Sequence, residues 1–161
     1  MKYCIPLLCM ALLLCGCSTH TADTTQVHKM TMKRFETMIN TADHDLAREL
    51  VADDAPFHTP ASPAPLYGGE GYVSVVDWMR QAFPDVQWKL EDMVAEGNTV
   101  AVRWTLSGTH KGEFLGMPAT GRRFSTSVMN FYFFNDEGKI INDIAAEGMI
   151  GILRGIGMLD K

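Results

Sequence analysis

Apolar residues in the first half of the chain recur at helical spacing. From Val27 onward they stand three, four and seven positions apart, which predicts a helix with one buried face. Asp43 has the side chain of an N-cap for a second short helix, and a third helix follows Gly69 and stops at Pro84. The apolar positions of these helices are Phe35, Met38, Ile39 and Ala42, then Leu46, Ala47, Leu50 and Val51, then Tyr72, Val75, Val76, Met79, Ala82 and Phe83.

After Pro84 the apolar period changes to two, which is the spacing of strands. The first two strands flank a hairpin turn at residues 96–98, and two more are predicted over 124–134 and 139–148. Helices followed by a meander of antiparallel strands predict a single α+β domain. The alternating apolar residues of the first pair are Val86, Trp88, Leu90 and Val94, then Val100, Val102, Trp104 and Leu106.

Residues 108–122 form a long connection between two of these strands. Four glycines and Pro118 interrupt it, so no regular helix or strand can run through it. The connection therefore places His110 at the end of a strand. Loops held by rigid strands often carry binding groups.

The order Gly-Thr-His-x-Gly-x-Phe-x-Gly-x-Pro-x-Thr-Gly-Arg in this connection resembles the signature loop of the SnoaL-like polyketide and ester cyclases, in the NTF2-like superfamily. The resemblance covers residues 27–157 and implies a cone-shaped α+β barrel. In such a barrel, N-terminal helices pack on a curved, mostly antiparallel sheet that encloses a pocket. We therefore expect residues 27–161 to form one domain of this kind. The other matching segments are Ala82-Phe83-Pro84-Asp85-Val86, Gly138-Lys139-Ile140 and Leu153-x-x-Ile156-Gly157.

The N-terminus has the pattern of an export signal. Lys2 precedes an apolar run over residues 5–14 that is too short to span a bilayer as a helix. The end of this run resembles a bacterial lipobox, which implies a lipoprotein signal peptide over residues 1–16 and a lipid on Cys17. Residues 17–26 are polar and read as a tether. We expect a protein anchored to the bacterial cell envelope, at the outer membrane if the host has one. An ordinary secretory signal is the alternative.

Composition narrows the candidate chemistry. The net charge of −5 provides no basic surface for nucleic acid. All four cysteines lie within the first 17 residues, so the folded domain has neither a disulfide nor a thiol nucleophile. No spacing of His, Cys, Asp and Glu matches a metal site, and no glycine-rich phosphate loop opens a helix. We expect no metal and no cofactor.

The resemblance implies an intramolecular aldol reaction that uses an acidic residue near the end of the chain. That position falls on Gly148 in this sequence. If a strand runs through Gly148 and position 148 faces the pocket, alternation places Ile144 in the pocket and turns Asp143 and Glu147 away. Glu147 could enter only through a β-bulge, so it is either a catalytic carboxylate or a solvated edge residue.

Two histidines are further candidates. His110 either transfers protons beside the pocket or pins the glycine-rich connection through hydrogen bonds. His58 either lines the pocket or caps the proline-rich loop around it. For the apolar wall of the ligand pocket we single out Trp78, Trp104 and Met129 in addition to Ile144.

These observations predict an exported SnoaL-like lipoprotein that binds a small apolar or carbonyl-bearing molecule, with cofactor-free acid–base activity carried by His110 and Glu147. The alternative is a non-catalytic module for ligand binding or protein interaction, because Gly148 replaces the late acidic residue. The aromatic run 131–134 has apolar side chains for both faces of its strand, and the outer sheet face in the superfamily is often a subunit interface. A homodimer is therefore a further expectation.

Overall fold

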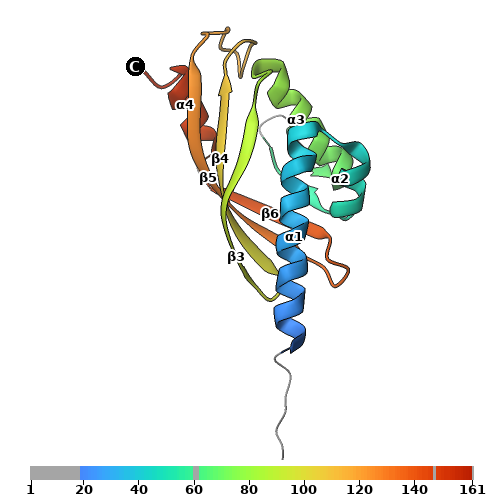
Figure 1. Ribbon diagram of the computed structural model, residues 1–161. Coiled ribbons are helices and arrows are strands. Elements are labelled where there is room, and N and C mark those ends of the chain that lie inside the picture. The colour runs from blue at the N-terminus through green and yellow to red at the C-terminus, as the bar shows by residue number, and fades with distance from the viewer. Residues whose placement is uncertain (1–18, 60–61, 147, 161) are drawn as a thin grey trace, which may run out of the picture.

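The computed structural model describes residues 19–59, 62–146 and 148–160. Three helices come first, and four long strands and a last helix follow (Figure 1). The predicted signal peptide, Cys17 and Glu147 lie outside the described residues. In the part of the chain that is described, no helix is both long and apolar enough to span a bilayer.

The helices lie where the apolar spacing predicts them. They are α1 (Thr19–Thr41), α2 (His44–Leu50) and α3 (Gly68–Ala82). The Asp43 side chain accepts a hydrogen bond from the Leu46 backbone N–H, as an N-cap does. Helix α1 begins earlier than expected. It includes most of the stretch 17–26, which we interpreted as a tether.

The second half of the chain forms an antiparallel meander. Strands β3 (Gln87–Glu96), β4 (Thr99–Thr109), β5 (Arg123–Phe134) and β6 (Ile140–Ala146) pair in sequence order. The short strands β1 (Pro56–Phe57) and β2 (Leu66–Tyr67) pair with each other in a separate sheet. The α+β class is confirmed, with helices packed on a curved sheet (Figure 1). The described strands do not close into one continuous barrel, and the helices cover the open side.

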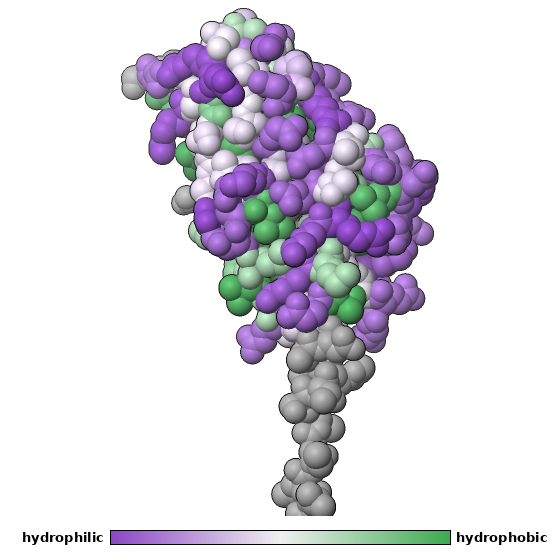
Figure 2. All heavy atoms as spheres, in the orientation of Figure 1, coloured by the Kyte–Doolittle hydropathy of each residue, from purple (hydrophilic) through white to green (hydrophobic). Residues whose placement is uncertain are grey.

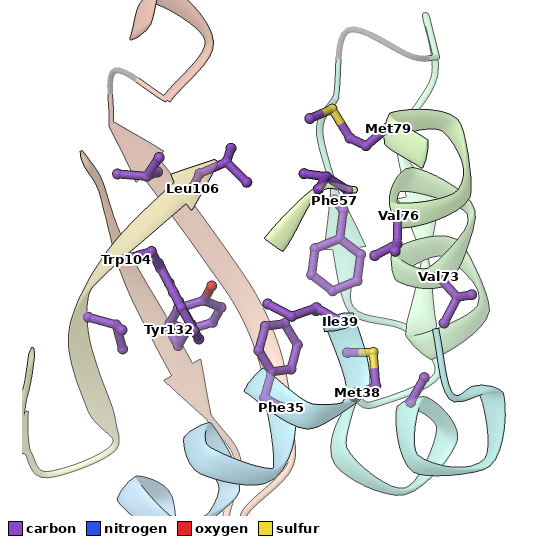
Figure 3. Packing of buried hydrophobic residues seen from close by; sticks show 14 of the residues in the cluster. Phe35, Met38, Ile39, Phe57, Val73, Val76, Met79, Trp104, Leu106 and Tyr132 are labelled. Atoms are coloured by element: carbon purple, nitrogen blue, oxygen red, sulfur yellow. The ribbon is translucent and has the colours of Figure 1, made fainter. Parts of the chain in front are cut away.

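The core lies between the inner face of the large sheet and the helices. Trp104 and Tyr132 of the sheet face side chains of α1 and α3 in Figure 3. Phe35 makes edge contacts with Tyr132 and Tyr72, which link the sheet to the helices through aromatic rings. The surface on the side of α1, seen in Figure 2, is mostly polar with scattered apolar residues.

The end of the chain differs from the prediction. The last strand stops at Ala146, and residues from Gly148 form helix α4 (Gly148–Ile156). Two glycines one turn apart bring this helix close to β5, because a Cβ at Gly151 would lie 1.9 Å from Thr126 Oγ1 and one at Gly155 would lie 2.4 Å from Phe124 Cβ. The helix therefore closes one end of the space between sheet and helices.

Candidate functional site

A cavity of about 200 Å³ lies between the inner face of the large sheet and the helices. Most of its wall is aromatic or aliphatic, which is typical of small-molecule sites. Figure 3 shows part of this wall, with Trp104, Leu106 and Tyr132 on the large sheet facing Ile39, Phe57, Val76 and Met79. The residues that line it are Ile39, Phe57, His58, Thr59, Tyr72, Val75, Val76, Trp78, Met79, Trp88, Trp104, Leu106, Val128, Asn130, Tyr132, Asp143, Ala145, Gly148, Met149 and Ile152.

Asp143 is the single carboxyl group among the described residues of this wall. It stands on β6 directly opposite Tyr132 of β5, and the Asn130 Nδ2 donates a hydrogen bond to its Oδ2 at 3.0 Å. Burial raises the pKa of the Asp143 carboxyl, and hydrogen bonds from Asn130 and Tyr72 act in the opposite direction. A carboxyl of raised pKa in a mostly apolar cavity is a stronger base than an ordinary aspartate, which suits it to proton transfer.

Two phenols lie near this carboxyl, and an indole lies beside one of them. Burial, followed by the nearby Asp143 charge, raises the pKa of both the Tyr72 and the Tyr132 hydroxyls, so both keep their protons and remain donors. The Trp104 indole lies beside Tyr132 and acts against the rise in the pKa of that phenol. The contact lacks ordinary hydrogen-bond geometry, however, and the buried Trp104 N–H has no partner.

The prediction that Asp143 faces away from the pocket and Ile144 faces into it is wrong. Asp143 and Ala145 line the cavity, whereas Ile144 is 57% exposed on the outer face. Alternation was counted backward from Gly148 along one strand, but β6 ends before that residue and α4 begins at it. Strand parity does not carry through a helix, so the count selected the wrong face.

Met129 is also misplaced by the prediction. It is 58% exposed and stands opposite Ala146 on the outer face, while its neighbours Val128 and Asn130 face inward. The same correction applies to Val94, which is exposed because a β-bulge between Leu90 and Asp92 reverses the face.

His58, Trp78 and Trp104 line the cavity, as the sequence predicted for them. Their contact with a ligand stays a prediction. Gly148 also lines the cavity, so the position that the resemblance assigns to an acid faces the same space as Asp143. Sequence reasoning missed Asp143. The pairing of the two strands around the hairpin at 135–139 could have found it, because that register places Asp143 directly opposite Tyr132.

His110 is fully buried but is not among the residues of the cavity wall. Its Nδ1 lies 3.0 Å from Thr120 Oγ1, and its backbone pairs with Gly121 and Arg122. The ring packs against Phe83, and burial lowers its pKa, so the imidazole is neutral near pH 7. This geometry favours a structural role for His110, in which its hydrogen bonds hold the connection 108–122 in place, over proton transfer to a ligand.

Within residues 19–59, 62–146 and 148–160, no cluster of three His, Cys, Asp or Glu side chains could hold a metal ion. The cavity wall offers hydrogen-bonding groups, the His58 imidazole and one carboxyl group as its means of acting on a ligand. This set is sufficient for acid–base chemistry on an uncharged molecule.

The family model described as SnoaL-like polyketide cyclase matches residues 29–156. The chain belongs to this family. The match includes the second half of α1, the other helices, the long connection and the whole large sheet, so the SnoaL-like resemblance of the sequence is confirmed. Membership suggests binding of a small molecule and cyclase activity, and it leaves the substrate open.

Individual relatives agree with this membership. Aklanonic acid methyl ester cyclase DnrD from Streptomyces peucetius is 36% identical over 94 residues, which are 57% of this chain and 63% of DnrD. The chain thus spans less than two thirds of that relative. The structure of TsrD from Streptomyces laurentii superposes with a TM-score of 0.72 at 27% identity, over 83% of this chain and 97% of TsrD. For the structure of IdmH from Streptomyces antibioticus the TM-score is 0.68 at 30% identity, over 81% of this chain and 98% of IdmH.

Proposed function

We propose that this SnoaL-like protein binds a small, largely apolar, carbonyl-bearing molecule in its cavity and acts on it by cofactor-free acid–base catalysis. The observation that carries the proposal is Asp143, a half-buried carboxyl of raised pKa in a mostly apolar wall. Asp143 takes the role that we first gave to Glu147 and His110. Gly148 leaves the usual acidic position empty, and Asp143 supplies a carboxyl group to the same cavity.

In the proposed reaction the ionised Asp143 removes a proton from a carbon next to a carbonyl group. The electron pair of the broken C–H bond forms an enolate, which attacks a second carbonyl group of the same molecule and closes a ring. The new alkoxide then takes the proton back from Asp143. The carboxyl group ends as it began, so the cycle needs no cofactor.

The first step can be tested without the natural substrate. 2-Indanone in D₂O exchanges the hydrogens next to its carbonyl group, and NMR follows the rate. We expect the protein to accelerate this exchange and Asp143→Asn to lower the acceleration by about 10²- to 10⁴-fold, the usual contribution of a general base. Asp77→Asn changes an exposed carboxylate on α3 and serves as the control. Equal rates for wild type and Asp143→Asn would contradict the proposed base.

A non-catalytic binding module is the second candidate, and Gly148 is the observation that favours it. This candidate predicts that 2-indanone binds and that its exchange stays at the buffer rate. Exchange that depends on Asp143 would exclude it.

We also propose that the protein is exported and that Cys17 carries a lipid. The apolar run followed by a lipobox-like end supports this proposal. Growth with an alkyne analogue of palmitate should label the wild-type protein in the membrane fraction and leave Cys17→Ala unlabelled. Label retained by Cys17→Ala would refute the anchor.

A homodimer through the outer sheet face is the last element of the proposal. Val94, Met129, Phe131 and Ile144 are exposed on this face, an apolar group of the kind that subunit interfaces cover. Sedimentation of the wild-type protein should give a dimer, and Phe131→Lys should dissociate it. Val27→Lys, at an exposed position of α1, is the control and should leave the dimer intact. A wild-type monomer at micromolar concentration would remove the dimer.

A further inference from the structure

Asn130 is a polar side chain in the buried part of β5. It is 7% exposed, and its neighbours on the inner face of the strand are the buried Val128 and Tyr132. A buried amide is costly unless it forms hydrogen bonds. Within the described part of the chain, the Asn130 side chain has one hydrogen-bond partner, the Asp143 carboxyl group.

The register of the sheet brings these two side chains together. Asn130 stands opposite Ala145, and Asp143 lies two residues before Ala145 on the same face of β6. Asn130 and Asp143 are therefore diagonal neighbours, and the small Ala145 side chain leaves room for the amide to reach across. The Asn130 Nδ2 lies 3.0 Å from the Asp143 Oδ2. Because an ionised carboxylate can only accept hydrogen bonds, it holds the amide with its nitrogen inward.

Helix α3 supplies a second donor to the same carboxyl group. Tyr72 packs edge-on against Phe35 and Phe57, with ring centroids 4.9 and 4.6 Å apart, and these contacts fix the direction of its ring. Its hydroxyl keeps its proton and forms a hydrogen bond with Asp143. The carboxyl group therefore meets one donor from the sheet and one from the helices.

These two donors offset the effect of burial on the Asp143 carboxyl group. Burial favours the protonated form, which cannot accept a proton, whereas hydrogen bonds to the carboxylate favour the ionised form. Tyr132, directly opposite Asp143, keeps its proton and adds no charge. The His58 imidazole, which follows β1, also lines the wall and is the other titratable group to consider.

We propose that Asn130 and Tyr72 are positioning residues for the reaction, which hold the Asp143 carboxylate in one orientation and in the ionised form that accepts a proton. This inference rests on the proposed function for the identity of the base. The hold on the carboxyl group can nevertheless be measured without any reaction.

The direct test is a carbon-detected NMR titration of the Asp143 carboxyl group. Asn130→Leu replaces the amide by an apolar side chain of similar shape. It should move the titration to higher pH, so that the ionised fraction below the midpoint falls by about tenfold, the usual effect of one hydrogen bond to a charged group. Tyr72→Phe keeps the ring and removes the hydroxyl. It should move the titration in the same direction and provides a second variant if Asn130→Leu does not fold.

Asn142→Leu is the matched control. Asn142 precedes Asp143 on β6 and stands opposite Phe133, so alternation places its side chain on the outer face of the sheet. The same chemical change at this position should leave the titration of Asp143 where it is in the wild type.

The exchange of 2-indanone hydrogens, measured over about pH 4–9, gives the functional readout. The rate should rise with pH as Asp143 ionises, and Asn130→Leu should move this rise to higher pH. At the acidic end, the rate should fall by about tenfold relative to wild type. A merely structural role for Asn130 would instead lower the rate by the same factor at every pH.

An unmoved titration of Asp143 in both folded variants would overturn the inference, and so would an equal loss of rate at every pH. A titration that moves as expected, in a protein that does not accelerate exchange, would refute the proposed reaction and leave the hold on Asp143 standing. Exchange that depends on Asp143 while the titration stays unmoved would do the reverse.

Discussion

Gly112→Ala is the most direct test of how the long connection is held. The Gly112 and Lys111 backbone N–H groups both donate to the Ala82 carbonyl at the end of α3, at 3.0 and 2.9 Å. A Cβ at position 112 would lie 2.1 Å from the Gln81 carbonyl oxygen, where real contacts exceed 3.0 Å. Because the obstacle is backbone, the connection must retreat by almost an ångström, and both hydrogen bonds lengthen.

The expected loss follows from these contacts. Two hydrogen bonds contribute about 1 kcal/mol each. Phe114, which is 2% exposed and packs on Phe83 and Trp78, loses part of its burial, or about 1 kcal/mol more. The sum of about 3 kcal/mol corresponds to a fall in Tm of about 6–12 °C for a chain of this size.

Urea unfolding followed by circular dichroism measures this loss. Gly116→Ala is the matched control, because Gly116 lies in the same connection with a φ of 80° and open space around it. It should lose only the cost of the left-handed conformation, about 1–2 kcal/mol. If Gly112→Ala lost no more than Gly116→Ala, the docking of the connection on α3 would not contribute to stability.

Three further predictions concern charged and titratable groups. Because the pKa of Asp143 is raised, the native state binds more protons than the unfolded chain above pH 3.8, and stability falls as the pH rises toward that raised value. Asp143→Asn should remove this fall and be more stable than wild type at pH 7, in urea titrations at pH 5 and 7. Burial lowers the pKa of His28, which stacks on Phe134, so stability should be lost as the pH falls below 6.5. His28→Phe should show less of this acid loss, and an unchanged pH profile would contradict its cause. The Arg34–Glu49 pair is exposed, so Arg34→Ala should leave the urea midpoint unchanged within error, and a clear shift would contradict that expectation.

The apolar spacing predicted most of the elements because their burial is one-sided. Phe35, Met38 and Ile39 are buried on α1, and Val102 and Trp104 are buried on β4. A helix or strand with one face in the core must repeat its apolar residues at its own period, so local sequence carries the signal. Helix α4 was missed because glycines are unusual inside a helix. In this helix the lack of side chains at Gly151 and Gly155 allows a close approach to β5.

The candidate site was predicted less well, because cavity residues come from several elements. Trp78 and Trp104 were identified as large aromatic groups on faces that point inward. Asp143 and Ile144 were assigned to the wrong faces, since the end of β6 decides which residues of that strand point inward. Met129 of β5 was also assigned to the wrong face. One residue of error in a strand exchanges the two faces completely.

By itself, the sequence determined the α+β class, the order of the elements and the SnoaL-like family, since periodicity and the signature connection are local properties of the chain. Only the tertiary structure decided which carboxyl group enters the cavity and that His110 stays outside its wall. The physical reason is that desolvation and hydrogen bonding depend on neighbours distant in sequence. Tyr72 reaches Asp143 from a helix, and Asn130 reaches it from the adjoining strand. Burial raises the pKa of this aspartate and these two hydrogen bonds act against the rise, and both effects exist only once the chain has folded.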